Sequence, residues 1–254
     1  MRTPDSQPQD FVVVAPTRSG STWLMDRINN VPGAQGHMEL FNHLPSQAPP
    51  RAGCNDYSRF VEIGNRFAHG IRPFAVFGYL DALYARPEAV GFKLMYPFLR
   101  QYPELLLYLS RRKIAVIHLV RNNHLDVILS EQLAGKTGRF HATKDEEFKQ
   151  KDVVSLDPVT VAARVRWLDR KQRIVRGMLR MLPNPMHEVS YEALCADNAP
   201  FIELCDFIGM PGELEDRSGS RLVKTQTSAH REVISNYQEV RSALDLAGYR
   251  HLLQ

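Results

Sequence analysis

The chain has 254 residues, enough for one large α/β domain or two small ones. Apolar residues make up 44% and charged residues 24%, close to the globular average, which excludes a disordered or fibrous protein. The formal net charge of +4 suits an anionic small ligand and is too small to indicate a nucleic-acid partner.

The first ten residues are polar and contain two prolines, so residues 1–10 are expected to form a loose arm ahead of a single domain at 11–254. The start of the chain has neither the apolar core of a signal peptide nor a run long enough to span a bilayer, which predicts a cytoplasmic protein without an integral membrane segment. Cys54, Cys195 and Cys205 form no CxxC pair and have no His at zinc-ligand spacing, so buried or idle thiols are expected.

Two strand-loop-helix units are predicted. FVVVA at 11–15 is a β-branched run of strand length, and LMDRINN at 24–30 follows it with a helical pattern. KIAVIHLV at 113–120 is a second buried strand, and residues 122–135 after it suit a helix. Strands buried on both faces are typical of parallel sheets. We therefore expect an α/β, P-loop-like, three-layer fold with a central parallel sheet flanked by helices.

The remaining segments complete this pattern. VGFKLMY and MHEVS are expected to be strands. ELLLYLS, YEALCAD and FIELCDFIGM are expected to be helices, and residues 231–253 one or two closing helices. Residues 33–72 predict irregular structure bordering a site, and residues 136–152 a mobile flap. Residues 159–182 predict a long amphipathic helix with a basic face, which suits solvent or an acidic partner. Its basic residues are Arg164, Arg166, Arg170, Lys171, Arg173, Arg176 and Arg180.

The turn after the first strand has the composition of an anion-binding loop: Thr17, Arg18, Ser19, Gly20, Ser21 and Thr22. Backbone N–H groups and the positive end of the helix dipole meet at such a turn. Gly20 allows a ligand to approach the backbone, Ser21 and Thr22 add hydroxyl donors, and Arg18 adds a forked cation. A phosphate or sulfate group is the expected ligand.

A small-molecule kinase or NTPase is the competing interpretation. Its loop reads GxxxxGK[ST] and its Ser/Thr hydroxyl binds magnesium. Here Ala15 stands in place of the first glycine and Ser21 in place of the lysine. The second strand is followed by Arg121 rather than by an acidic magnesium ligand, which favours a second anionic group over a metal. A non-catalytic nucleotide-binding module is a further alternative.

Two motifs resemble those of one enzyme family. PTRSGSTWL is similar to the 5′-phosphosulfate-binding loop of sulfotransferases that use 3′-phosphoadenosine 5′-phosphosulfate (PAPS), and HLVRNNHLDVILS resembles their 3′-phosphate-binding element. The resemblance implies that PAPS is the donor, that adenosine 3′,5′-bisphosphate is released, and that no metal is needed. It also implies that Arg121 and Ser130 clamp the 3′-phosphate while the Arg18 loop holds the other end.

The finer resemblance is to bacterial carbohydrate and lipid-linked sulfotransferases. Arg121 and Ser130 are nine residues apart, whereas cytosolic members usually have eight, and VSYEAL and LVKTQT are similar to the closing segment of the bacterial group. Lys224, with Arg221 nearby, is a further candidate contact to the nucleotide phosphates. The acceptor implied is a carbohydrate or a small metabolite, through a hydroxyl or an amine, and the sequence leaves the oligomeric state open.

The attacking hydroxyl needs a proton acceptor at neutral pH. Glu39 is the candidate base, because the resembling bacterial enzymes carry a glutamate at this place. His37 and His43 flank it and are alternatives. His118 lies inside a buried strand and is expected to be structural, and Lys93 is a candidate to face the site.

Overall fold

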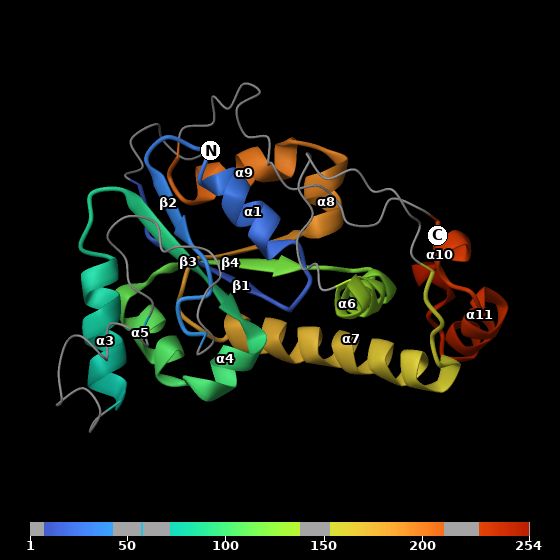
Figure 1. The fold of residues 1–254 in the computed structure, drawn as a ribbon. Helices are drawn as coiled ribbons and strands as arrows, with labels where there is room; N and C mark the ends of the chain where they lie inside the picture. Colours follow the sequence, from blue (N-terminus) through green and yellow to red (C-terminus); the bar gives the residue numbers. More distant parts are fainter. Residues whose placement is uncertain (1–7, 43–56, 58–71, 138–152, 211–228, 254) are drawn as a thin grey trace. The chain divides into compact units, whose positions relative to one another are not determined.

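The computed structural model describes residues 8–42, 57, 72–137, 153–210 and 229–253 (Figure 1). These residues form two compact units by their contacts, Met1–Val120 with Met178–Ser220 and Arg121–Gly177 with Arg221–Gln254. We call them the sheet unit and the helical unit and describe each by itself. The prediction of a single domain at 11–254 stays a prediction.

The sheet unit is built on five parallel strands in the order β2-β3-β1-β4-β5. Their bounds are β1 Phe11–Ala15, β2 Ala34–His37, β3 Ala89–Met95, β4 Ala115–Val120 and β5 Met186–Ser190. From β1 the chain goes to β2 on one side, and from β4 it goes to β5 on the other side. The connections therefore reverse direction between β1 and β4, and ligands of open parallel sheets bind outside the carboxyl ends at such a point.

Helices cover both faces of this sheet (Figure 1). On one face lie α1 Ser21–Ile28, α8 Tyr191–Ala196 and α9 Ala199–Phe207. Their side chains form one buried cluster with alternate residues of β1, including Phe11 and Val13. Alternation in a strand sends every second side chain to the same face, so the remaining residues of β1 point to the other layer.

The opposite face is covered by α3 Arg72–Leu83, α4 Tyr96–Gln101 and α5 Glu104–Arg112. Aromatic rings fill much of this layer: Phe41 lies 5.6 Å from Phe92 of β3 and 5.2 Å from Tyr102, measured between ring centroids. The α/β, three-layer fold with a central parallel sheet is thus confirmed.

The helical unit contains α6 His124–Thr137, most of α7 Pro158–Arg180, α10 His230–Val233, α11 Tyr237–Leu246 and the 3₁₀ turn η1 Arg250–Leu252. Its core joins the apolar faces of these elements, for example Leu129 of α6, Val165 of α7 and Leu244 of α11. A parallel bridge between Val154 and Ile234 connects the segment before α7 to the segment after α10.

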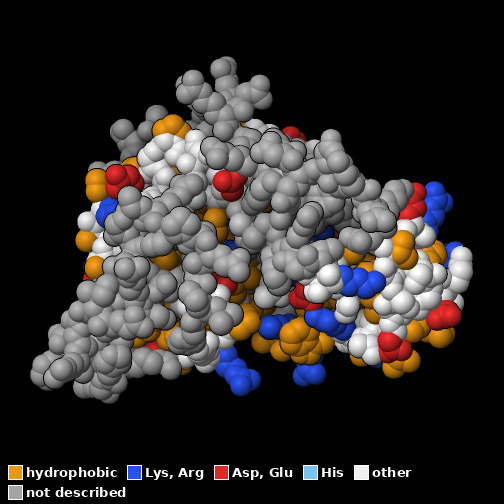
Figure 2. Space-filling model, viewed as in Figure 1, with side chains coloured by type: hydrophobic (Ala, Val, Ile, Leu, Met, Phe, Trp, Pro, Cys, Tyr) orange, Lys and Arg blue, Asp and Glu red, His pale blue; other side chains and the backbone are white. Residues whose placement is uncertain are grey.

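The long amphipathic helix predicted at 159–182 is α7, which begins at Pro158, a residue that suits the first helical turn. Its basic face is exposed at Arg166, Arg170 and Arg173, and Figure 2 shows blue Lys and Arg side chains beside orange hydrophobic ones in the region of α7. Among the described residues no helix is both long enough and apolar enough to cross a membrane.

The structure differs from the sequence expectation at β2. Residues 33–72 are expected to be irregular, yet Ala34–His37 form a strand, because they pair in register with β3 from Ala34–Ala89 to His37–Phe92. AQGH has little intrinsic strand preference, so this edge strand depends on its neighbour. Residues 138–152, where most of the predicted flap falls, lie outside the described residues.

The cysteines give a prediction of differential reactivity. Burial raises the pKa of the Cys205 thiol to about 12, whereas Cys195 is exposed. In a Cys54→Ser background, a maleimide at pH 8 is expected to modify Cys195 in the folded protein and to reach Cys205 only after denaturation, because the thiolate is the reactive form. Intact-mass spectrometry before and after denaturation measures this, and equal labelling of both thiols in the folded protein would contradict it.

Candidate active site

The loop between β1 and α1 has an unusual backbone. Arg18 has a φ of 57° and Gly20 a φ of 83°, both in the left-handed region, and α1 begins at Ser21. Turns of this kind point successive backbone N–H groups into a concavity that binds anions. Gly20 is the N-cap of α1 and has no side chain to cap the helix, and the first N–H groups of an α-helix have no intrahelical acceptor.

Gly20 is also fixed by a close neighbour. A Cβ atom at this position would lie 2.3 Å from Cδ2 of Tyr191, the first residue of α8. The Tyr191 ring is held in turn by Trp23 of α1, which meets it edge-on at 5.7 Å between centroids. The loop therefore requires glycine at position 20 for two reasons, its positive φ and the absence of room.

Ser19 supplies a second sign of an anion site. Its side chain is fully buried, and its Oγ has no hydrogen-bond partner among the described residues. A buried hydroxyl without a partner costs about 1–3 kcal/mol, so a native loop rarely retains one unless something binds there. Ser21 is also buried, and its hydroxyl donates to the sulfur of Met95 at 4.0 Å.

Lys93 joins this loop to the predicted base. It lies in β3, all of whose residues are buried, and its own exposure is 6%. Its Nζ donates to Oγ1 of Thr22 at 3.1 Å and forms an ion pair with Oε1 of Glu39 at 2.9 Å. A charge buried this deeply requires partners, and both partners here are residues that the sequence motifs single out.

The register of the sheet explains why Glu39 reaches Lys93. The strand β2 ends at His37, opposite Phe92, and the backbone N–H of Lys93 donates to the carbonyl of Met38 at 3.4 Å. Glu39 therefore follows directly beyond the carboxyl end of β2. Its Oε2 accepts from Nδ2 of Asn42 at 3.3 Å, and 29% of its side chain is exposed. The carboxylate is thus oriented by two donors and still open to solvent on one side.

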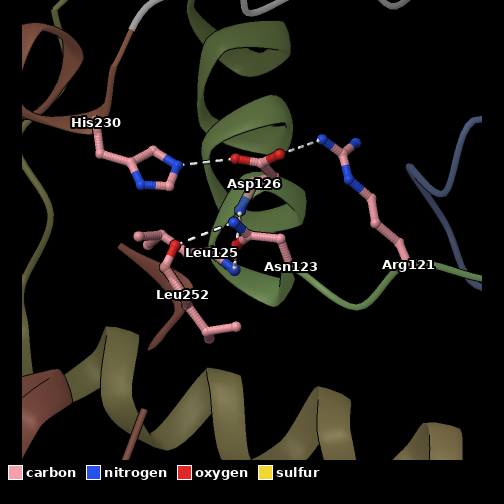
Figure 3. A network of polar contacts seen from close by, with 6 residues as sticks. All are labelled: Arg121, Asn123, Leu125, Asp126, His230 and Leu252. Carbon is pink, nitrogen blue, oxygen red and sulfur yellow. Dashed lines mark hydrogen bonds and ion pairs between the residues drawn. The ribbon is translucent and has the colours of Figure 1, made fainter. Parts of the chain in front are cut away.

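A second polar cluster lies in the helical unit (Figure 3). Arg121 directly follows β4, as predicted, and its Nη2 donates to Oδ2 of Asp126 at 2.8 Å. The other oxygen of Asp126 lies 2.8 Å from Nε2 of His230 in α10. Arg121 is 7% exposed, so its ion pair with Asp126 is buried. An ordinary surface ion pair, the alternative explanation for an arginine at this position, would be exposed to solvent.

The first turn of α6 is fixed by Asn123. Its Oδ1 accepts from the backbone N–H groups of Leu125 at 3.1 Å and Asp126 at 3.2 Å, which caps the helix. Its Nδ2 donates to the carbonyl of Leu252 at 3.0 Å (Figure 3). The helix therefore begins at His124, two residues later than the sequence predicts. Ser130, the other predicted phosphate ligand, is buried in the same helix.

The structure thus brings together one set of predicted residues, Thr22, Glu39 and Lys93. Arg18 belongs to the sheet unit and Arg121 to the helical unit, so the two-ended clamp stays a prediction. Lys224, Arg221 and His43 lie outside the described residues. His118 is fully buried, with its ring nitrogens 2.7 Å from the Tyr96 hydroxyl and 2.8 Å from Glu188, as expected for a structural histidine.

Sequence reasoning missed Asp126 and His230 as parts of the second cluster, since they are 104 residues apart. The one available signal was an acidic residue in the first turn of the helix that follows Arg121. Within the described part of the chain, no three His, Cys, Asp or Glu residues are grouped as metal ligands would be.

No protein-family model matches the chain, and no curated protein matches its sequence. The solved structures similar to it include one from mouse, one from the curacin biosynthetic pathway and one from Alicyclobacillus acidocaldarius. A mouse sulfotransferase, SULT7A1, complexed with PAP, is 15% identical with a TM-score of 0.45, over 94% of this chain and 65% of that chain. All three are sulfotransferases.

The second is the sulfotransferase domain of the curacin biosynthetic pathway, 18% identical with a TM-score of 0.42, over 94% of this chain and 99% of that domain. The third is a sulfotransferase from Alicyclobacillus acidocaldarius, 15% identical with a TM-score of 0.49, over 96% of this chain and 94% of that chain. This chain therefore spans slightly less than two thirds of the length of the mouse enzyme.

Proposed function

We propose that the protein is a PAPS-dependent sulfotransferase that moves a sulfuryl group onto a hydroxyl or amine of a carbohydrate or small-metabolite acceptor. The single observation that carries the proposal is the contact of Lys93 with both Thr22 and Glu39. It joins an anion-binding loop to a carboxylate that can accept a proton. Binding alone would need the loop, but it would not need an oriented carboxylate beside it.

The residues of the loop fit the 5′-phosphosulfate end of the donor. The N-terminus of α1 offers backbone N–H groups, and the buried Ser19 hydroxyl offers a donor that has no acceptor among the described residues. Thr17, Gly20, Ser21 and Thr22 complete the loop, and Arg18 adds a permanent positive charge. A kinase-type loop has a lysine at the position where this chain has Ser21. Here Lys93, in the neighbouring strand β3, supplies the ammonium group instead.

The reaction needs alignment and charge stabilisation more than covalent chemistry from the protein. The acceptor oxygen forms a bond to sulfur while the bond from sulfur to the bridging oxygen breaks in line. The acceptor proton passes to Glu39, and the products are a sulfate ester and adenosine 3′,5′-bisphosphate. Arg18 and Lys93 offset the negative charge that grows on the bridging oxygen. The transferred group carries less charge than a terminal phosphate, so the proposal includes no metal.

The assignment of the 3′-phosphate to Arg121, Ser130 and Lys224 is retained from the sequence resemblance. In its support, Arg121 follows β4 at the carboxyl edge of the sheet, beside the strand that carries the loop. The preference for a carbohydrate acceptor and the cytoplasmic location are likewise proposals from the sequence.

A thermal-shift assay tests the donor assignment. Adenosine 3′,5′-bisphosphate at about 100 times its Kd is expected to stabilise the protein by about 2.7 kcal/mol, which raises Tm by roughly 5 to 11 °C, without magnesium. ATP is expected to shift Tm little with or without magnesium. Arg18→Ala should reduce the shift because it removes a cation from the loop.

Stabilisation by ATP only in the presence of magnesium would favour the kinase instead. Stabilisation by neither nucleotide would contradict the donor assignment altogether. Turnover of labelled donor with a panel of sugars and hydroxylated metabolites then identifies the acceptor class.

A further inference from the structure

We propose that Asp126 and His230 are positioning residues that hold the Arg121 guanidinium in the orientation in which it binds a phosphate. This inference rests on the proposed function, because it takes Arg121 as the ligand of the 3′-phosphate. It adds two residues that do not themselves contact the nucleotide. Asp126 lies between Arg121 and Ser130 within the segment HLVRNNHLDVILS, without an assigned role there, and His230 lies outside it.

The first step of the argument is the way in which Asp126 is shared. One carboxylate oxygen accepts from Arg121 Nη2 and the other lies at hydrogen-bond distance from His230 Nε2, both at 2.8 Å (Figure 3). Arg121 and Asp126 are each 7% exposed and His230 is 2% exposed. Water competes poorly with contacts this deeply buried, so the orientation of each side chain depends on the other two.

The second step is that Asp126 is itself anchored to the backbone. Asn123 caps the turn that carries Asp126 and at the same time binds the carbonyl of Leu252 in η1. His230 is the first residue of α10. Ile234, directly after this helix, forms a parallel bridge with Val154 in the segment before α7. The backbone that carries Asp126 is therefore fixed by the Asn123 cap and its bond to η1, and the carboxylate has His230 of α10 as a second partner besides Arg121.

The third step is the consequence for binding. A free arginine side chain loses rotamer entropy when it is fixed, and a held one has lost that entropy before the ligand arrives. The planar fork of the guanidinium binds a phosphate well only in the matching orientation. Partners that orient a ligating side chain typically change affinity by roughly 10- to 100-fold when they are removed, as in metal sites.

The test separates this role from a general effect on folding. The quantity to measure is the ratio of two dissociation constants, Kd for adenosine 5′-phosphate divided by Kd for adenosine 3′,5′-bisphosphate. This ratio reports only what the 3′-phosphate contributes. Calorimetry on the wild type, Asp126→Asn, His230→Leu and His230→Gln gives it, with Tm measured for each. Asp245→Asn is the matched control, because Asp245 is an exposed carboxylate of the same unit that pairs with Arg250.

We expect the ratio to fall roughly tenfold in Asp126→Asn and His230→Leu. It should stay within about twofold of wild type in His230→Gln, whose side-chain N–H can still donate to Asp126, and in Asp245→Asn. A lower Tm with an unchanged ratio would overturn the inference, because the network would then be purely structural. A raised ratio would also overturn it, since Asp126 would then compete with the phosphate for Arg121.

The outcome for the wild type distinguishes this inference from the function on which it rests. A wild-type ratio near one would remove the 3′-phosphate assignment of Arg121 and the positioning role with it. A large wild-type ratio that all variants retain would leave the donor assignment intact and remove the positioning role alone.

Discussion

Glu39→Gln is expected to lower kcat by about 10²- to 10⁴-fold, the usual contribution of a positioned general base. Glutamine keeps the size of the side chain and an oxygen that can contact Lys93, but it does not accept a proton from the acceptor hydroxyl. The Kd for adenosine 3′,5′-bisphosphate should stay within about twofold, because the polar contact from Glu39 to the loop runs through Lys93 in the described part of the chain. Steady-state turnover of labelled donor and calorimetry measure the two quantities.

The control for this variant is Glu88→Gln, a change of the same chemistry at an exposed carboxylate just before β3. It should leave kcat unchanged. Full turnover by Glu39→Gln would exclude Glu39 as the base. His37, at the end of β2, would then be the next candidate base and the next residue to substitute. Loss of bisphosphate binding in Glu39→Gln would instead assign the carboxylate a role in keeping Lys93 in place.

Gly20→Ala is the second large effect expected, on both stability and donor binding. The new Cβ would lie 2.3 Å from the Tyr191 ring, at a φ of 83° that L-residues adopt at a cost of about 1–2 kcal/mol. Overpacking of a close contact adds typically about 1–3 kcal/mol, so the free energy of unfolding should fall by roughly 2–5 kcal/mol. Urea unfolding measures this loss. Bisphosphate binding should weaken as well, since the backbone N–H groups of the loop shift.

Two further variants separate the two causes. Gly78→Ala in α3 has nothing within 4 Å of the new Cβ and should stabilise the protein by roughly 0.5–1 kcal/mol, as expected for a helix interior. Tyr191→Ala combined with Gly20→Ala removes the ring that the Cβ meets, so in this background the alanine should cost only the backbone contribution. Equal stability of Gly20→Ala and wild type would show that position 20 does not need the left-handed conformation.

The sequence by itself determined the elements whose signals are local. The β-branched run at Phe11–Ala15 and the buried run at Ala115–Val120 are strands, and the 23-residue α7 follows its apolar spacing. The place of the loop between β1 and α1 could also be predicted, because Gly20 and its hydroxyl neighbours are contiguous; that this loop binds an anion stays a prediction. These features depend on side-chain period and backbone preference, which a short window of sequence contains.

Only the tertiary structure decided how distant residues meet. Thr22 and Lys93 are 71 residues apart and Asp126 and His230 are 104 apart, and no local pattern encodes either contact. The parallel register of β2 and β3 brings Glu39 beside Lys93. The strand β2 has little strand preference of its own and is formed by its pairing with β3. Parallel strands are joined through long crossovers, so their pairing follows from burial across the whole sheet rather than from the residues of any one segment.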